Sequence, residues 1–160
     1  MTIRHARATD LDALDALEQR CFPPEEAATR TSFAQRLAVF PNHFWLAEEN
    51  GQLLACVNGC VSDLPLLQDE MFENANLHNE QGAWQMLFGV ETHPDAQGKG
   101  FASALMRQMI ADAKAQGRQG VVLTCKEELL DFYRRFGFKN EGISASQHGG
   151  AVWYDMRLQF

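Results

Sequence analysis

The sequence lacks any run of about 18 consecutive apolar residues, the length that a membrane-spanning helix needs. Its first residues, Met1-Thr2-Ile3-Arg4-His5-Ala6-Arg7, turn charged at once and therefore lack the apolar stretch of a signal peptide. We expect a soluble, cytoplasmic protein that has no membrane partner.

Metal-binding motifs and a basic surface are missing as well. The four cysteines, Cys21, Cys56, Cys60 and Cys125, are scattered without a C-x-x-C pair or spaced histidines, so we predict reduced buried thiols and no metal site. The formal net charge of −7 argues against a nucleic-acid partner, which requires a basic face. An acidic balance keeps a protein soluble, and it is also compatible with a cationic substrate such as an amine.

What the sequence does contain is the composition of an ordinary globular protein. With 160 residues, of which 46% are hydrophobic and 22% charged, the chain can bury one continuous core, and we expect a single domain over residues 1–160. Apolar spacing predicts helices near Leu11–Cys21 and Phe33–Phe40. Strands over Phe44–Glu49 and Leu53–Val61 are predicted to form a hairpin, because Asn50-Gly51 tolerates the positive φ angles of a tight turn.

The second half of the sequence alternates strands and helices. An apolar strand over Trp84–Glu91 leads to a helix that starts near Gly100 and ends at Gly117. A buried strand over Gly120–Cys125, a helix over Glu127–Phe136 and a last strand over Ala151–Leu158 follow. This order predicts an α/β or α+β architecture in which helices cover a sheet.

A glycine-rich run, Gln97-Gly98-Lys99-Gly100-Phe101-Ala102, lies between the strand that ends at Glu91 and the next helix. Its glycines allow close backbone approach, and the N–H groups at a helix N-terminus favour a pyrophosphate. A P-loop would need a hydroxyl residue where Gly100 stands, and a dinucleotide-binding fold would place the glycines directly at the strand end and an acidic residue about 20 positions on. Neither pattern fits, and a glycine turn without a ligand is the alternative for this loop taken alone.

The same run matches the signature Q/R-x-x-G-x-G/A of the GNAT superfamily of N-acetyltransferases, which the chain resembles. A second segment, Phe132-Tyr133-x-x-Phe136-Gly137-Phe138, is similar to that family's F-Y-x-x-x-G-F segment, and 87–90 stands where its central strand stands. The resemblance covers most of the chain. It implies a mixed, mostly antiparallel sheet of six to seven strands with a splayed central strand pair, flanked by about four helices, and acetyl-CoA as the acyl donor.

Within the superfamily, 123–138 and the loop Pro23–Ala27 resemble the arylalkylamine, or serotonin-type, N-acetyltransferases. Vertebrate members of that group carry two histidines on the strand before the binding loop, where this chain has Trp84 and Met86. The sequence therefore provides no histidine pair for a proton relay on that strand.

The resemblance assigns roles to individual residues. The backbone of Phe88, Gly89 and Val90 would meet the pantetheine arm and the thioester, with an N–H as the oxyanion donor. The other predicted coenzyme contacts are Gln97, Gly98, Lys99, Gly100, Phe101, Ala102, Phe132 and Arg135. Tyr133 is predicted to donate a proton to the departing thiolate, because a phenol with a reference pKa of about 10 stays protonated at neutral pH.

No sequence motif identifies the base that deprotonates the acceptor amine. Glu26 or Glu25, on the loop before the second helix, is the first candidate, because a glutamate on the corresponding loop is thought to act in insect members of the group. The alternative is a pair of solvated loop acids. Three histidines, His78, His93 and His148, have no partners in the sequence, and His78 is the second candidate because it comes shortly before the central strand.

These residues together predict an enzyme that transfers an acetyl group from acetyl-CoA to the primary amine of a small, arylalkylamine-like molecule. The reaction would be a direct attack in a ternary complex, and the protein would be a monomer or a homodimer. A protein N-terminal or lysine acetyltransferase is one alternative, and a non-catalytic acyl-CoA sensor is another. The irregular segment Ser62–Gly82 is long enough to cover the acceptor site and slightly favours a small molecule.

Overall fold

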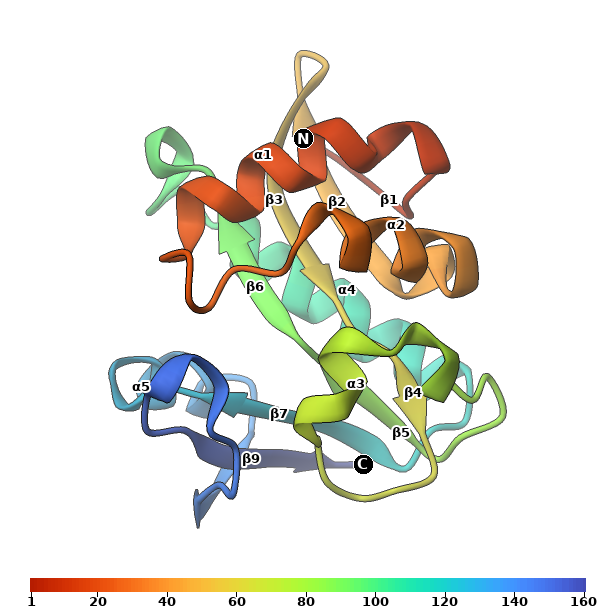
Figure 1. Ribbon diagram of the computed structural model, residues 1–160, viewed down its shortest axis with the longest axis vertical. Coiled ribbons are helices and arrows are strands. Elements are labelled where there is room, and N and C mark those ends of the chain that lie inside the picture. The colour runs from red at the N-terminus through yellow and green to blue at the C-terminus, as the bar shows by residue number, and fades with distance from the viewer.

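A computed structural model describes all residues, Met1–Phe160, as nine strands and five α-helices with short 3₁₀ turns between them (Figure 1). The first half contains β1 (Thr2–Arg4), α1 (Leu11–Cys21), α2 (Arg30–Val39), β2 (Phe44–Glu49), β3 (Gln52–Asn58), β4 (Val61–Ser62) and α3 (Asp69–Glu73). The second half contains β5 (Trp84–Leu87), β6 (Gly89–Thr92), α4 (Phe101–Ala115), β7 (Gly120–Cys125), α5 (Leu130–Arg134), β8 (Lys139–Ile143) and β9 (Tyr154–Gln159).

The strands form two sheets, in the orders β1-β2-β3-β6 and β4-β5-β7-β9-β8. Neighbouring strands are antiparallel except β5 and β7, which run parallel from Trp84 opposite Gly120 to Leu87 opposite Leu123. This mixed, mostly antiparallel arrangement confirms the predicted fold class.

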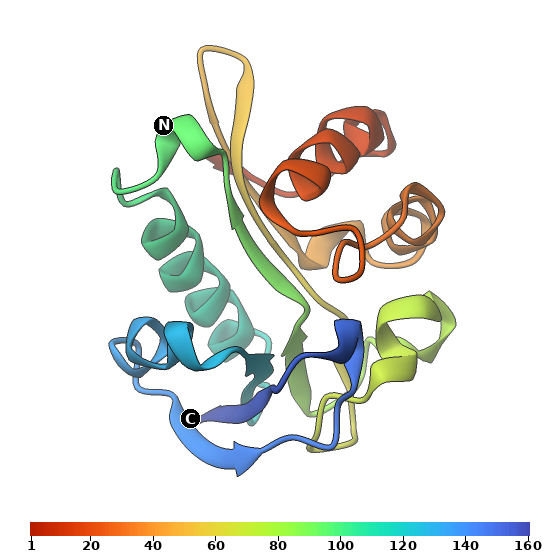
Figure 2. The ribbon, with the colours of Figure 1, turned by 60° about the vertical axis from the view of Figure 1, so that its left-hand side comes forward.

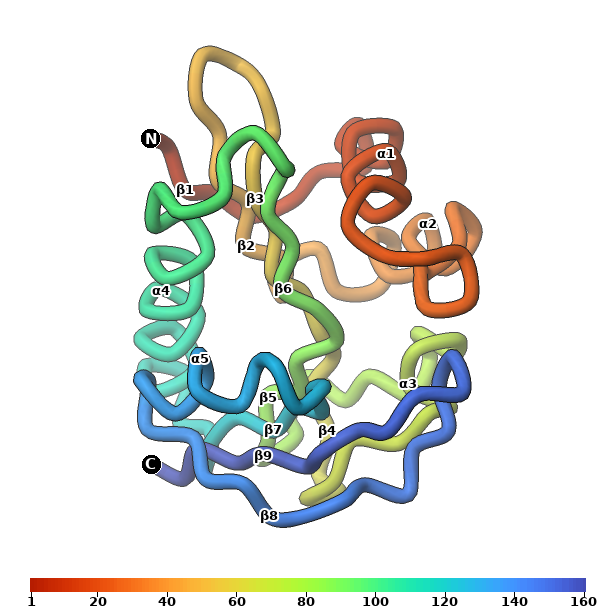
Figure 3. Tube along the Cα trace, turned by 90° about the vertical axis from the view of Figure 1, so that its left-hand side faces the viewer, coloured from red at the N-terminus to blue at the C-terminus, as the bar shows by residue number.

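The predicted central strand is broken at Phe88, and the break produces the expected splay. β5 pairs with β7, whereas β6 pairs only with β3, so β6 and β7 diverge (Figure 3). The strand count exceeds the predicted six to seven because of this break and because the short strands β4 and β8 were not predicted. The last strand begins at Tyr154 rather than Ala151, and the helix predicted over Glu127–Phe136 is a 3₁₀ turn followed by α5.

The hairpin between β2 and β3 is confirmed by its turn. Asn50 and Gly51 have φ angles of 54° and 76°, which lie in the left-handed region that Asn and Gly accept most readily.

Helices cover both faces of the first sheet, with α4 on one side and α1 and α2 on the other (Figure 2). The alternation of side chains along β2 explains the two cores, because Trp45 and Ala47 face α4 while Phe44 and Leu46 face α1 and α2. Full burial of a side chain such as Leu46 contributes roughly 1.5–3 kcal/mol. The Trp45 indole also donates a hydrogen bond of 2.8 Å to Asp112 on α4. No helix in the structure has the length and apolar character that crossing a membrane requires.

Candidate functional site

The break at Phe88 leaves one edge of β6 without a strand partner. The Phe88 N–H donates to the Asn58 carbonyl at 2.7 Å, which anchors the break to β3. A Cβ on Gly59 would lie 1.9 Å from the Met86 carbonyl oxygen, so only glycine fits where the chain leaves β3. The three residues predicted to meet the thioester, 88–90, therefore lie at the start of an open strand edge.

The glycine-rich run Gln97–Ala102 forms a loop and the first turn of α4. Gly98 and Gly100 have φ angles of 78° and 83°, a region that side chains other than glycine rarely adopt. Gly100 is the N-cap and no side chain caps the helix, so the first N–H groups of α4 are open to an anion. Lys99 is exposed in the same loop and adds a positive charge.

The last two predicted coenzyme contacts lie apart from this loop. Phe132 is on α5, which lies beside the C-terminal half of α4 in Figures 2 and 3. Arg135 follows directly after α5, and its guanidinium carbon is 5.5 Å from the centre of the Phe132 ring. The predicted coenzyme contacts outside β6 therefore form two groups, one in the loop 97–102 and one at the end of α5.

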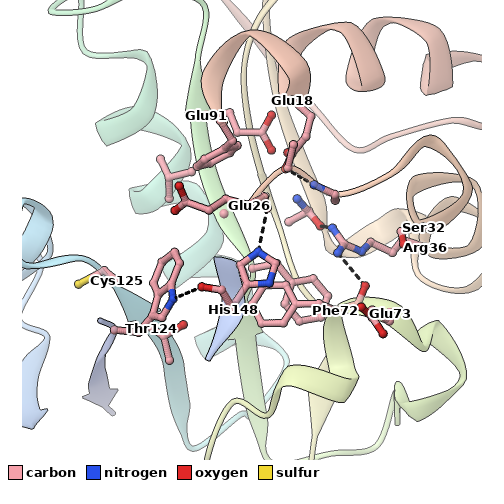
Figure 4. A pocket seen from close by; sticks show the side chains of 18 of the residues that line it. Glu18, Glu26, Ser32, Arg36, Phe72, Glu73, Glu91, Thr124, Cys125 and His148 are labelled. Carbon is pink, nitrogen blue, oxygen red and sulfur yellow. Dashed lines mark hydrogen bonds between the residues drawn. The ribbon is translucent and has the colours of Figure 1, made fainter. Parts of the chain in front are cut away.

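A cavity of about 140 Å³ opens beside β6 (Figure 4). The loop between α1 and α2, the helix α3, the strands β6 and β7 and the segment before β9 contribute its wall. Its aromatic lining consists of Phe22, Phe72, Phe88, Tyr133 and Trp153. Its charged lining consists of the acidic residues Glu18, Glu26, Glu73 and Glu91 and the basic residue Arg36. Because acidic groups outnumber basic ones, the cavity suits a cation.

Tyr133 lines this cavity from α5. Burial raises the pKa of its phenol well above the usual value, and the nearby Cys125 adds to this effect. The hydroxyl therefore stays protonated across the neutral range and can act as a hydrogen-bond donor.

Of the two loop glutamates predicted as bases, only Glu26 lines the cavity. Its Oε1 and Oε2 lie 2.6 and 2.8 Å from Lys126 Nζ, and its backbone carbonyl lies 2.8 Å from His148 Nε2. Glu25 is exposed and lies outside the cavity wall. The Glu26 carboxylate is therefore already paired with the Lys126 ammonium group.

His78, the other predicted base, lies outside the cavity in a cluster with His43 and Glu80. Its Nδ1 accepts the Val61 N–H at 2.9 Å, so its proton is on Nε2, which is 2.9 Å from Glu80 Oε1. Burial lowers the pKa of His78. Since Nε2 donates to the carboxylate, it offers no lone pair to a metal ion.

Two buried acids that the sequence did not single out lie at the inner end of the cavity. Glu91 on β6 is 1% exposed, and neither of its carboxylate oxygens has a hydrogen-bond partner. Burial and the neighbouring Glu18 raise the pKa of Glu91 well above the usual value. The signal for both was present, because Glu91 interrupts an apolar strand and Glu18 follows Leu14 by one helical turn on the buried face of α1.

Arg36 was also missed, although it lies on the apolar face of α2 after Phe33. It is 3% exposed, with Nη1 3.1 Å from Asn58 Oδ1 and Nη2 2.9 Å from the Phe72 carbonyl. The guanidinium carbon lies 4.6 Å from the centre of the Phe88 ring, a cation–π contact at the break.

His148, for which the sequence indicated no partner, lies in the cavity wall. Its ring stacks on Phe72 with the ring centres 5.2 Å apart and the planes at 10°. Because the Glu26 carbonyl can only accept a hydrogen bond, Nε2 carries the proton, and the lone pair of the neutral ring is on Nδ1.

Comparison with known families identifies the family of the chain that carries the splayed strand, the glycine-rich loop and the cavity. Residues 2–140 match the family model described as "Acetyltransferase (GNAT) domain". The chain belongs to this family and is an acyl-CoA-dependent N-acetyltransferase.

Solved structures of low sequence identity share the fold. A GphF GNAT-like decarboxylase in complex with isobutyryl-CoA is 24% identical over 99% of both chains, with a TM-score of 0.87. The loading GNATL domain of CurA from Lyngbya majuscula is 19% identical over 99% of this chain and 96% of its own, with a TM-score of 0.85. The ribosomal-protein-S18-alanine N-acetyltransferase from Escherichia coli is 19% identical over 99% of this chain and 92% of its own, with a TM-score of 0.74. These relatives give no support to the arylalkylamine subgroup.

Proposed function

We propose that this protein acetylates the primary amine of a small molecule that the cavity beside β6 encloses. The donor is acetyl-CoA, and the amine attacks it directly in a ternary complex. The observation that carries this proposal is the acidic lining of the cavity, where the carboxyl groups of Glu18, Glu73 and Glu91 outnumber one guanidinium, while the fourth glutamate, Glu26, is paired with Lys126. An amine is a cation at neutral pH, so it is the acceptor for which such a cavity offers the most favourable electrostatics.

The size of the cavity also favours a small acceptor. Its volume of about 140 Å³ lies below the range of roughly 300–1,000 Å³ that is usual for drug-sized ligands. The aromatic lining suits the apolar part of a short amine. A peptide acceptor would need an open groove instead.

The chemistry assigned to the strand edge and to Tyr133 follows from their positions. The neutral amine attacks the thioester carbonyl carbon, and an N–H on the open edge of β6 stabilises the oxyanion that forms. The C–S bond then breaks, and the Tyr133 hydroxyl donates a hydrogen bond to the thiolate. Because the pKa of Tyr133 is raised, its phenol is a weak acid and acts first by stabilising the leaving group.

An acceptor panel tests the proposal. We would offer acetyl-CoA with short alkylamines, a diamine, phenethylamine, tryptamine and a peptide with an N-terminal alanine, and measure thiol release and product mass. We expect transfer to small amines, with the lowest KM for those with a short apolar part. Acetylation of the peptide alone would identify a protein acetyltransferase, and acyl-CoA binding without any transfer would identify a sensor.

Decarboxylation of an acyl-CoA that carries a carboxylate is a second candidate, because the GphF protein that shares this fold is a GNAT-like decarboxylase. The buried Arg36 is the observation in its favour, since a guanidinium is a good partner for a carboxylate. Glu18 and Glu91 weigh against it, because they would repel a third carboxylate. Conversion of malonyl-CoA to acetyl-CoA without an amine would establish this activity.

A further inference from the structure

Two acids at the inner end of the cavity, Glu18 and Glu91, take no part in the attack on the thioester or in the departure of the thiolate. Glu91 lies on β6, and its Oε1 is 3.7 Å from the position that a Cβ on Gly89 would take, close to the proposed thioester site. Glu18 reaches the cavity from α1, and its Oε2 accepts the Ala28 N–H at 2.8 Å. Its Oε1 accepts no N–H from the protein. Figure 4 shows the two carboxylates next to each other.

The surroundings of Glu91 favour one proton between the two carboxylates. Adjacent buried carboxylates cannot both ionise at low cost, so such a pair holds a proton and titrates as a unit. The groups that face Glu91 are Glu18 and Cys21 from α1, Arg36 from α2 and Cys56 from β3. Burial raises the pKa values of both thiols, which are therefore neutral. The single negative charge of the pair is matched by the positive charge of Arg36.

We propose that Glu18 and Glu91 form one proton-sharing pair, in which Glu18 takes the proton of the acceptor ammonium and Glu91 positions that proton. This inference rests on the proposed amine acetylation. Glu18 is the catalytic residue, because one of its oxygens is available to the ligand. Glu91 is a positioning residue, because both of its oxygens are inaccessible to solvent and it acts through the neighbouring Glu18.

The protons balance across the reaction. The ammonium N–H gives its proton to Glu18, the neutral nitrogen forms the C–N bond, and the C–S bond breaks. The nitrogen then loses its second proton to solvent, Tyr133 gives a proton to the CoA thiolate, and the Tyr133 phenolate takes one proton back from solvent, so these transfers cancel. The pair then releases its extra proton to solvent, so acetylation of each ammonium yields amide, CoA thiol and one proton.

Other groups in the wall are less suited to this step. The Glu26 carboxylate is held by Lys126 at 2.6 and 2.8 Å. His148 has a free Nδ1 and is the rival base, which the experiment must separate from the pair.

The test is the pH dependence of kcat/KM for the best amine of the panel, in the parent protein and in four variants, one of which is a control. We expect Glu18→Gln to lower kcat by about 10²- to 10⁴-fold, as is usual for loss of a general base. Glu91→Gln should lower kcat less and move the acidic limb of the profile to higher pH, because the substitution removes the acid that donates its proton to the ionised Glu18 carboxylate. His148→Gln should leave the position of that limb unchanged. Glu49→Gln, an exposed hairpin residue, is the control for the change of carboxylate to amide.

An infrared measurement tests the pair without any acceptor. The parent protein at pH 7 should show the C=O stretch of a protonated carboxylic acid, and Glu91→Gln should lack it. The proposal is overturned if the infrared band is absent from the parent protein. It is also overturned if Glu91→Gln keeps the acidic limb of the parent pH profile, or if only His148→Gln loses that limb. A parent protein that shows the band but acetylates no amine would refute the proposed function and leave the pair in place.

Discussion

The Lys126 ammonium lies 2.8 Å from Glu26 Oε2 and joins residues 100 positions apart in the sequence. The contact ties the loop between α1 and α2 to the end of β7, where both line or border the cavity. The Glu26 loop is also held by His148, whose Nε2 donates to the Glu26 carbonyl at 2.8 Å. The cavity is therefore closed on this side by polar contacts between distant segments.

Breaking this ion pair should loosen acceptor binding. Because Lys126 is 36% exposed, the pair contributes at most about 1 kcal/mol, so Lys126→Met should raise the KM for the amine on the order of 5-fold. Affinity for acetyl-CoA should not change. Arg134→Met breaks the exposed pair with Asp131 and is the matched control, which should leave the KM as it is. An unaltered KM in Lys126→Met would show that the pair does not hold the wall.

Removal of the Tyr133 hydroxyl should slow the chemical step alone. Tyr133→Phe keeps the ring contacts with Phe132 and Phe138, so we expect a stable protein that binds acetyl-CoA normally. Loss of the donor to the thiolate should lower kcat by about 10²-fold or more. Calorimetric titration and steady-state kinetics measure both effects. The same change at the second tyrosine, Tyr154→Phe, is the control, and an equal loss there would contradict the role of Tyr133.

The glycine loop should bind the donor through its backbone. Gly100 and Gly117 have φ angles of 83° and 79°, and no atom lies within 4 Å of the position that a Cβ would take on either residue, so alanine strains each of them equally, by about 1–2 kcal/mol. Both variants should lose thermal stability to the same degree. Only Gly100→Ala should also weaken acetyl-CoA binding, because Gly117 lies at the other end of α4. Equal coenzyme affinity in the two variants would argue against a pyrophosphate site at this loop.

The buried Glu91 should make stability fall as pH rises. Its pKa is raised in the folded protein, so above the ordinary value of 4.5 the unfolded chain releases a proton that the folded chain keeps. The free energy of unfolding should then decrease by up to about 1.4 kcal/mol per pH unit until the folded-state pKa is reached. Glu91→Gln removes this pH dependence of stability. The melting temperature of the variant minus that of the parent should therefore increase as the pH is raised from 5 to 8. A constant difference across that range would contradict the raised pKa.

The sequence predicted the features that local patterns determine. Asn50-Gly51 predicted the hairpin because positive φ angles restrict residue type. Gly98 and Gly100 predicted the loop because glycine allows close backbone approach, and the structure gives both residues positive φ angles. The sequence predicted one continuous strand over Trp84–Glu91 and not the break at Phe88, because apolar residues continue through this position. The break depends instead on pairing with two different strands, β3 and β7.

The inner end of the cavity was missed because its members are far apart in the sequence. A charged residue interrupts the apolar face of each of three elements: Glu18 on α1, Arg36 on α2 and Glu91 on β6. Each is an isolated exception to the apolar periodicity of its own element. Only the packing of α1 against β6 and of α2 against α1 reveals that the three residues share one buried environment. A systematic search for charged residues at apolar positions would have found all three.

The residues that line the cavity are spread along the chain from Glu18 to Trp153, so the cavity forms late in the synthesis of the protein. Contacts between distant positions form only after the intervening chain has closed on itself, and a nascent chain leaves the ribosome N-terminus first. The glycine loop and α4 emerge early enough to fold before β9 exists. His148 and Trp153 emerge later, so the wall of the acceptor cavity can be completed only after most of the chain has been synthesised.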